Sequence, residues 1–159
     1  MEKLTAATNE NSLLAVLSGD KRIAIHRISA EQELQVRTAD EKYVYDAASG
    51  RLLFAMLTDA EIERFTNKYG VPSAEMWSEA SSEERLRTVV AQIRREECAF
   101  QVLPGRQVVG LAVPVFKHDR IVASLSIYLP EYRFMAIDKM TLVNQLKSTA
   151  QKISDKLRH

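Results

Sequence analysis

Residues 107–129 read QVVGLAVPVFKHDRIVASLSIYL and contain two apolar runs separated by a short polar segment, Lys117–Arg120. Within each run one set of side chains alternates with another at every second residue, which is the period of a β-strand rather than of a helix. The polar segment is short enough to be a hairpin loop. The stretch therefore predicts two antiparallel strands, over 107–116 and 121–129.

The two faces of these strands differ in character. On one face of the second strand every residue is apolar, and this face is expected to pack on helices: Ile121, Ala123, Leu125, Ile127 and Leu129. The opposite face mixes hydroxyl and apolar groups: Val122, Ser124, Ser126 and Tyr128. In the first strand one face consists of small or compact residues: Val108, Gly110, Ala112 and Pro114.

These last two sets decide whether the sheet offers a binding surface. A glycine such as Gly110 weakens a strand interior unless another group approaches the backbone closely there. If the small-residue face of one strand adjoins the Ser and Tyr face of the next, the sheet forms a shallow concavity with hydroxyl donors, typical of a pocket for a small polar ligand. The alternative is an ordinary strand surface that faces solvent.

The N-terminal part of the chain predicts a second hairpin. The apolar run Leu13–Ser18 ends at Gly19-Asp20, a pair that favours a tight turn, and Arg22–Ile28 alternates again. The polar segment Glu31–Glu41 predicts a loop, and Tyr43–Tyr45 predicts a short strand.

Helical patterns occupy the middle and the end of the chain. Residues Ala48–Leu57 predict a helix, and capping boxes at Thr58–Glu61 and Ser81–Glu84 predict the start of two more. A third strand is expected over Cys98–Val102, joined to the next by a turn at Leu103–Arg106. The chain ends in a helix from about residue 137. Helices grouped between and after antiparallel strands indicate an α+β fold, a central antiparallel or mixed sheet with helices packed on it.

Composition limits the class of protein. The chain has 159 residues, the length of one domain, with 46% hydrophobic and 27% charged residues, values typical of a globular protein. A formal net charge of +1 argues against a free-standing nucleic-acid binder. No apolar run approaches the ~18 residues of a membrane span. The single Cys98 excludes a disulfide framework and fits a reducing cytoplasm.

The sequence contains no strong motif for catalysis or metal binding. No set of His, Cys, Asp and Glu has the spacing of metal ligands, and no phosphate-binding or dinucleotide motif is present. Cys98 follows two glutamates, which would raise the pKa of its thiol and make it a poor nucleophile. We therefore expect no enzyme activity, no cofactor and no metal.

A different signal lies at the start of the helix predicted from Ala48. In the segment Asp46–Arg51, residues 47–50 are small and leave the first backbone N–H groups of the helix accessible. Those groups, together with the helix dipole, favour an anion such as a carboxylate. The alternative is an ordinary helix start.

Four segments, in this order, carry a resemblance to a known family: YDAASGRLLFA at 45–55, RREECAF at 94–100, VVGLAVPVF at 108–116 and IVASLSI at 121–127. Over almost its whole length the sequence resembles the C-terminal, GAF-like effector-binding domain of IclR-type transcriptional regulators. The resemblance implies a GAF-like/profilin-like fold that binds a small-molecule effector, an organic acid or an aromatic compound. It also implies assembly into a homodimer or tetramer.

Matching by motif places the implied effector site at eight residues: Ala48, Ser49, Gly50, Gln101, Val108, Gly110, Ser126 and Tyr128. Three of them depart from the family pattern. Gln101 stands where many members have Asp, Gly110 where several have Cys, and Tyr128 where a small residue is common. The tyrosine would narrow the site.

The resemblance also implies how such a domain is used. We expect residues 1–159 to form one effector-sensing domain, with the family's N-terminal winged helix absent from this chain. DNA would then be bound only through a domain outside these residues, in a cytoplasmic protein with no membrane contact. The alternative is an oligomerisation or interaction domain with a vestigial pocket.

Overall fold

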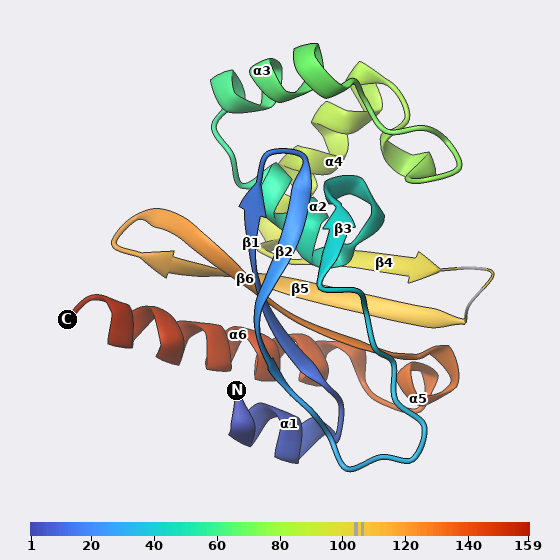
Figure 1. Ribbon diagram of the computed structural model, residues 1–159, viewed down its shortest axis with the longest axis vertical. Coiled ribbons are helices and arrows are strands. Elements are labelled where there is room, and N and C mark those ends of the chain that lie inside the picture. Colours follow the sequence, from blue (N-terminus) through green and yellow to red (C-terminus); the bar gives the residue numbers. More distant parts are fainter. Residues whose placement is uncertain (104, 106) are drawn as a thin grey trace.

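A six-stranded antiparallel sheet forms the centre of the protein (Figure 1). The structure, a computed structural model, describes residues 1–103, 105 and 107–159. The order across the sheet is β3-β2-β1-β6-β5-β4, with every neighbouring pair antiparallel. The strands are β1 Ser12–Ser18, β2 Lys21–Ile28, β3 Glu41–Tyr43, β4 Ala99–Leu103, β5 Val108–Lys117 and β6 Arg120–Pro130.

Helices cover both faces of this sheet. They are α1 Glu2–Thr8, α2 Ala48–Ala55, α3 Asp59–Tyr69, α4 Glu83–Glu96, α5 Glu131–Met135 and α6 Lys139–Leu157. In Figure 1 α1 and α6 lie below the sheet, and α2, α3 and α4 lie above it. None of the described helices is long and apolar enough to cross a membrane. The α+β fold predicted from the sequence is confirmed.

Two apolar cores result, one on each side of the sheet. Alternate residues of β5 and β6, such as Leu111 and Ile127, pack with Leu146 of α6. The residues between them, such as Ala112 and Tyr128, belong to the core that contains α2. The predicted division of each strand into two faces is therefore confirmed.

The strand face with the serines and Tyr128 is buried. Ser124 and Ser126 are 0% exposed and Tyr128 is 3% exposed, so the interpretation as a solvent-facing surface is wrong. The cause is α2, all eight residues of which are buried between the sheet and the rest of the upper layer. In the β5–β6 register Gly110 pairs with Tyr128, and Ala112 pairs with Ser126. The small-residue face thus adjoins the hydroxyl face, as the sequence predicted.

The local predictions succeed where a specific turn or cap defines them. Gly19 has φ +59° in the β1–β2 turn, and Thr58 forms a complete capping box with Glu61. The cap of α4 is Ser82 rather than Ser81, because the Ser82 side chain accepts from the backbone nitrogen of Arg85.

Other predictions need correction. The strand expected at Tyr43–Tyr45 lies earlier, in β3, and Val44–Asp46 forms a 3₁₀ turn instead. The short helices α1 and α5 were not predicted, because one or two turns give too little periodicity to detect. The turn expected at Leu103–Arg106 includes residues 104 and 106, which lie outside the described residues.

Candidate ligand site beneath helix α2

The first turn of α2 is capped by side chains from the sheet. Its N-cap residue, Ala47, offers no side-chain acceptor. Instead the backbone nitrogen of Ala48 donates to Oε1 of Gln101 on β4 at 2.9 Å. The backbone nitrogen of Ser49 donates to the hydroxyl of Tyr128 on β6 at 3.2 Å, and Ser49 Oγ lies 3.1 Å from the same oxygen. The positive end of the helix dipole therefore points into a buried polar cluster.

Several polar atoms on this face of the sheet have no hydrogen-bond partner. Among the described residues, the unpaired buried side-chain atoms are Gln101 Nε2, Ser124 Oγ, Ser126 Oγ and Arg22 Nε. All four come from strand positions that face α2. The residues two positions from Arg22 and Gln101, which are Ala24 and Ala99, pack in the α2 core, as does Ala112, the cross-strand partner of Ser126. An unpaired buried polar atom costs about 1–3 kcal/mol. Four on one face indicate a surface built for more contacts than the chain itself makes.

Two glycines allow the close packing at this site. A Cβ on Gly50 would lie 2.2 Å from the carbonyl oxygen of Val44, so α2 rests directly on the 3₁₀ turn before it. A Cβ on Gly110 would lie 2.6 Å from Cε1 of Tyr128 and 3.1 Å from the Cβ of Ala48. The tyrosine ring thus occupies the room that the absent Gly110 side chain leaves.

Arg51, in α2 itself, links the helix by hydrogen bonds to the segments before and after it in the chain. Its Nε donates to the carbonyl of Tyr45 at 2.8 Å and its Nη2 to the carbonyl of Met76 at 2.7 Å. The guanidinium also lies 4.6 Å from the centre of the Trp77 ring. Burial lowers the pKa of Arg51 to about 10, opposed by Glu79 and other groups.

Arg22 is a second buried guanidinium, and it lies on β2. Its Nη1 donates to the carbonyl of Ala39 at 2.9 Å, and its Nη2 lies 3.4 Å from Oγ1 of Thr38. Burial lowers the pKa of Arg22, while Tyr128 and Asp40 oppose that effect. Sequence analysis did not single out this residue. The available signal was a charged side chain at a strand position that alternates with Ile23.

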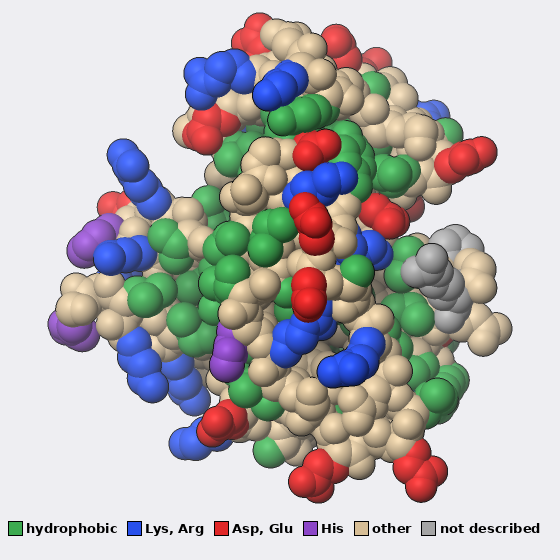
Figure 2. Space-filling model, viewed as in Figure 1, with side chains coloured by type: hydrophobic (Ala, Val, Ile, Leu, Met, Phe, Trp, Pro, Cys, Tyr) green, Lys and Arg blue, Asp and Glu red, His purple; other side chains and the backbone are tan. Residues whose placement is uncertain are grey.

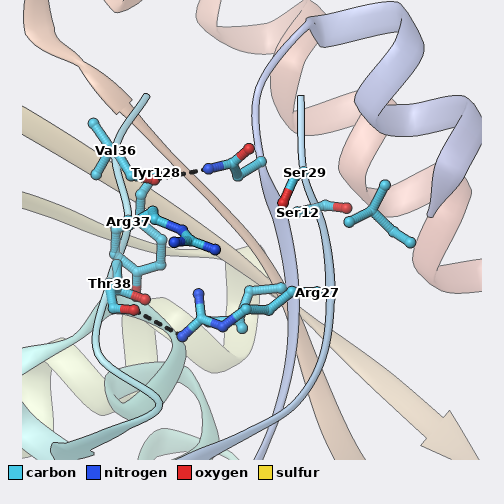
Figure 3. Close-up of a pocket in the computed structure, with 10 residues that line it drawn as sticks. Ser12, Arg27, Ser29, Val36, Arg37, Thr38 and Tyr128 are labelled. Atoms are coloured by element: carbon cyan, nitrogen blue, oxygen red, sulfur yellow. Dashed lines mark hydrogen bonds between the residues drawn. The ribbon is translucent and has the colours of Figure 1, made fainter. Parts of the chain in front are cut away.

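Two cavities border the cluster. The larger, of about 490 Å³, lies on the α4 side and is lined by Asp46, Arg51, Trp77, Cys98 and Gln101 among others. The smaller, of about 10 Å³, is lined in part by Ser12, Arg27, Arg37, Thr38 and Tyr128 (Figure 3). The first has the volume of a small-molecule site, and the second has room for about one water molecule.

The walls of the smaller cavity are basic. Figure 3 shows Arg27 reaching from β2 towards Thr38, and Arg37 extending from the facing loop into the space between them. Arg27 donates to the Thr38 carbonyl at 2.7 Å and pairs with the exposed Asp40 at 2.9 Å. Over β2 and β3 on the outer surface, in contrast, acidic and basic side chains are interspersed (Figure 2).

The structure brings most of the predicted site residues together. Five of them meet at the start of α2: Ala48, Ser49, Gln101, Gly110 and Tyr128. Ser126 lies on the same face of β6, and Val108 packs at the edge of the same core. Gly50 is turned towards Val44 rather than towards the sheet. No three His, Cys, Asp or Glu side chains gather as a metal site in the part of the chain that the structure describes.

Comparison with known proteins identifies relatives of this chain. A family model described as "Bacterial transcriptional regulator IclR C-terminal" matches residues 1–155. The HTH-type transcriptional regulator KdgR of Dickeya chrysanthemi is 28% identical over 162 residues, which cover 99% of this chain and 52% of that protein. The chain thus spans about half the length of this curated relative.

Solved structures share the fold. The C-terminal domain of Escherichia coli KdgR superposes with a TM-score of 0.82 at 25% identity, over 100% of this chain and 94% of that one. A putative regulator from Rhodococcus sp. RHA1 has a TM-score of 0.87 at 21% identity, over 99% and 64%. An IclR homolog from Microbacterium hydrocarbonoxydans, complexed with 4-hydroxybenzoate, has a TM-score of 0.81 at 23% identity, over 99% and 65%.

Proposed function

Because this chain belongs to the family of IclR C-terminal domains of bacterial transcriptional regulators, we propose that it senses a small organic acid or aromatic effector. The family consists of transcriptional regulators rather than enzymes. Effector binding would change how a DNA-binding region outside these 159 residues engages its operator. The binding energy available for that change is the difference in effector affinity between the two states of the regulator.

The observation that carries this proposal is the first turn of α2. Its buried N–H groups are held by Gln101 and Tyr128, while Gln101 Nε2 and Ser126 Oγ on the same sheet face remain unpaired. A carboxylate placed there would accept hydrogen bonds from these donors and would interact favourably with the helix dipole. The eight residues named from the sequence, Gly50 and Val108 included, remain the proposed site.

Two further facts support a small ligand. The cavity of about 490 Å³ beside Gln101 and Arg51 falls within the size range of small-molecule pockets. A structural relative was solved with 4-hydroxybenzoate, a compound that is both an acid and an aromatic. We propose the same chemical class here.

The regulator is proposed to act as a homodimer or tetramer in the cytoplasm, with DNA bound only through its other region. Light scattering on the purified chain tests the assembly directly. A monomer at every concentration would contradict that part of the proposal.

Variants of two buried serines test the site. Ser126→Ala removes an unpaired hydroxyl, so the ligand-free protein should keep its free energy of unfolding or gain up to about 1 kcal/mol. Its affinity for the effector should fall about tenfold, the effect of one lost hydrogen bond in a buried site. Ser154→Ala is the matched control, because Ser154 accepts from Phe116 and donates to Ala150 on the opposite face. It should lower stability and leave effector affinity unchanged.

The probes are a series of small organic and aromatic acids that includes 4-hydroxybenzoate, screened by thermal shift and measured by calorimetry. Equal affinity of the wild type and Ser126→Ala for every acid that binds would contradict the proposed site.

An oligomerisation domain with a vestigial pocket is the second candidate, favoured by one observation. Tyr128 fills the room beside Gly110 and narrows the site. A stable dimer by light scattering, with no acid bound in the whole series, would support this candidate against effector sensing.

A further inference from the structure

Arg22 is an unusual occupant of the core. Its side chain is fully buried, on the face of β2 that turns towards α2. The backbone carbonyl of Ala39 and the hydroxyl of Thr38 accept from its terminal nitrogens, but Nε has no partner. These acceptors are neutral, so they satisfy hydrogen bonds without balancing the charge.

No carboxylate among the described residues forms an ion pair with Arg22. The two acids nearest in electrostatic effect, Asp40 and Asp46, pair instead with Arg27 at 2.9 Å and Lys42 at 3.5 Å. Arg27 adds a second positive charge that acts against Arg22. A buried guanidinium without a counter-charge is strongly unfavourable, and such charges are normally paired.

The location of Arg22 connects it to the proposed site. Thr38, which accepts from Arg22, lines the small cavity together with Tyr128, Arg27 and Arg37 (Figure 3). The hydroxyl of Tyr128 in turn caps Ser49 at the start of α2. Tyr128 therefore lines the same cavity as the Arg22 acceptor Thr38 and also caps the start of α2.

We propose that Arg22 makes this site selective for anionic ligands, its guanidinium supplying the counter-charge for a small carboxylate held at the start of α2. The proposal rests on the proposed function and adds to it the charge of the ligand and the residue that recognises it. Among the described residues no group accepts from the buried Nε–H of Arg22, so this donor is free for a ligand. Charge-assisted hydrogen bonds from a guanidinium to a carboxylate are among the strongest in proteins.

Matched acids and amides test this charge selectivity. The probes are acetate and acetamide, pyruvate and pyruvamide, and benzoate and benzamide, which differ within each pair chiefly in charge. Their affinities are measured by calorimetry or NMR titration at constant ionic strength. The wild type should bind at least one acid about tenfold or more tightly than its amide. In Arg22→Gln that preference should fall below about threefold, because acid affinity should fall much more than amide affinity.

Two further variants complete the design. Arg120→Gln makes the same charge change at an exposed position and should keep the acid preference. Arg22→Lys keeps the charge but loses the Nε–H donor, so acid affinity should fall about three- to tenfold, and by more than amide affinity. This variant decides the question if Arg22→Gln does not fold.

The outcomes separate the two proposals. If acid and amide affinities fall equally in the Arg22 variants, or if the wild type binds both equally well, Arg22 has only a structural role and this inference is overturned, while the effector site stands. If the wild type binds none of the six compounds or the other acids screened, effector sensing itself fails and the inference falls with it.

Discussion

Gly110 and Tyr128 are cross-strand partners in which the ring of one residue fills the space that a side chain on the other would need. A Cβ on Gly110 would lie 2.6 Å from Cε1 and 2.9 Å from Cδ1 of Tyr128. This close approach brings the Tyr128 hydroxyl to the backbone nitrogen of Ser49. The glycine thus permits the contact between sheet and helix on which the site is built.

Gly110→Ala should break that contact. The new methyl group displaces the Tyr128 ring, so the Ser49 N–H loses its acceptor, and we expect the free energy of unfolding to fall by about 2–3 kcal/mol. Urea denaturation measures the loss. In a Tyr128→Ala background the same substitution should cost less than about 1 kcal/mol, because the clash with the ring is gone and only the 3.1 Å approach to the Cβ of Ala48 remains. Additive effects of the two substitutions would contradict this explanation.

Tyr128→Phe should isolate the contribution of the hydroxyl. The ring stays in place while the buried N–H of Ser49 loses its partner, and we expect a loss of about 1–3 kcal/mol in urea denaturation. Tyr132→Phe is the control, since Tyr132 is 61% exposed and its hydroxyl accepts from Arg133 at the surface. That variant should change stability by less than about 0.5 kcal/mol. Equal effects of the two variants would show that the Tyr128 hydroxyl does not cap α2.

Gln101→Glu should separate the cap from the ligand contact. A carboxylate at this position still accepts from Ala48 and suits the helix dipole. It removes the unpaired Nε2 donor and adds a negative charge beside the proposed carboxylate site. We expect affinity for an acidic effector to fall about tenfold or more, measured by calorimetry. Gln107→Glu, at an exposed position, should have no such effect. Tighter binding of acids by Gln101→Glu would argue against an anion at this position.

Cys98 should react slowly with alkylating reagents. Burial raises the pKa of its thiol, with Lys147 and Lys139 acting in the opposite direction. In the urea-unfolded chain the alkylation rate should reach half its maximum near the ordinary thiol pKa of about 8.5. In the folded protein it should do so at a higher pH. Above that value the unfolded state loses its proton first, so the contribution of Cys98 to stability should decrease as pH rises. The same half-maximal pH for folded and unfolded chains would contradict the shift.

The sequence predicted the strands well because each strand divides cleanly between two environments. Leu125 and Ile127 meet α6, while Ser124 and Ser126 meet α2, so the two-residue period was strong. The sequence could not predict that the hydroxyl face is buried, because this burial depends on α2 being covered on all sides. Nor could it predict that Gly50, which stays in the proposed site, packs against the carbonyl oxygen of Val44.

Arg22 shows a different limit of sequence analysis. Its significance depends on Thr38 and Ala39, which lie 16 and 17 residues further along the chain. It depends as well on the proximity of Tyr128, more than a hundred residues away. Periodicity reports which way a side chain points but not which distant groups meet it. An arginine at an inward position was the only local sign that a charge is buried there.

Strand β6 contributes side chains to both apolar cores. Tyr128 and Ser126 project from one side of this strand, and Leu125, Ile127 and Leu129 project from the other into the packing of α6. A close-packed interior leaves little slack for one side of a strand to move without the other. A ligand that moves the backbone at Tyr128 would therefore also shift Ile127 and Leu129 against α6. One strand would in this way connect the buried site to α6 on the opposite side of the sheet.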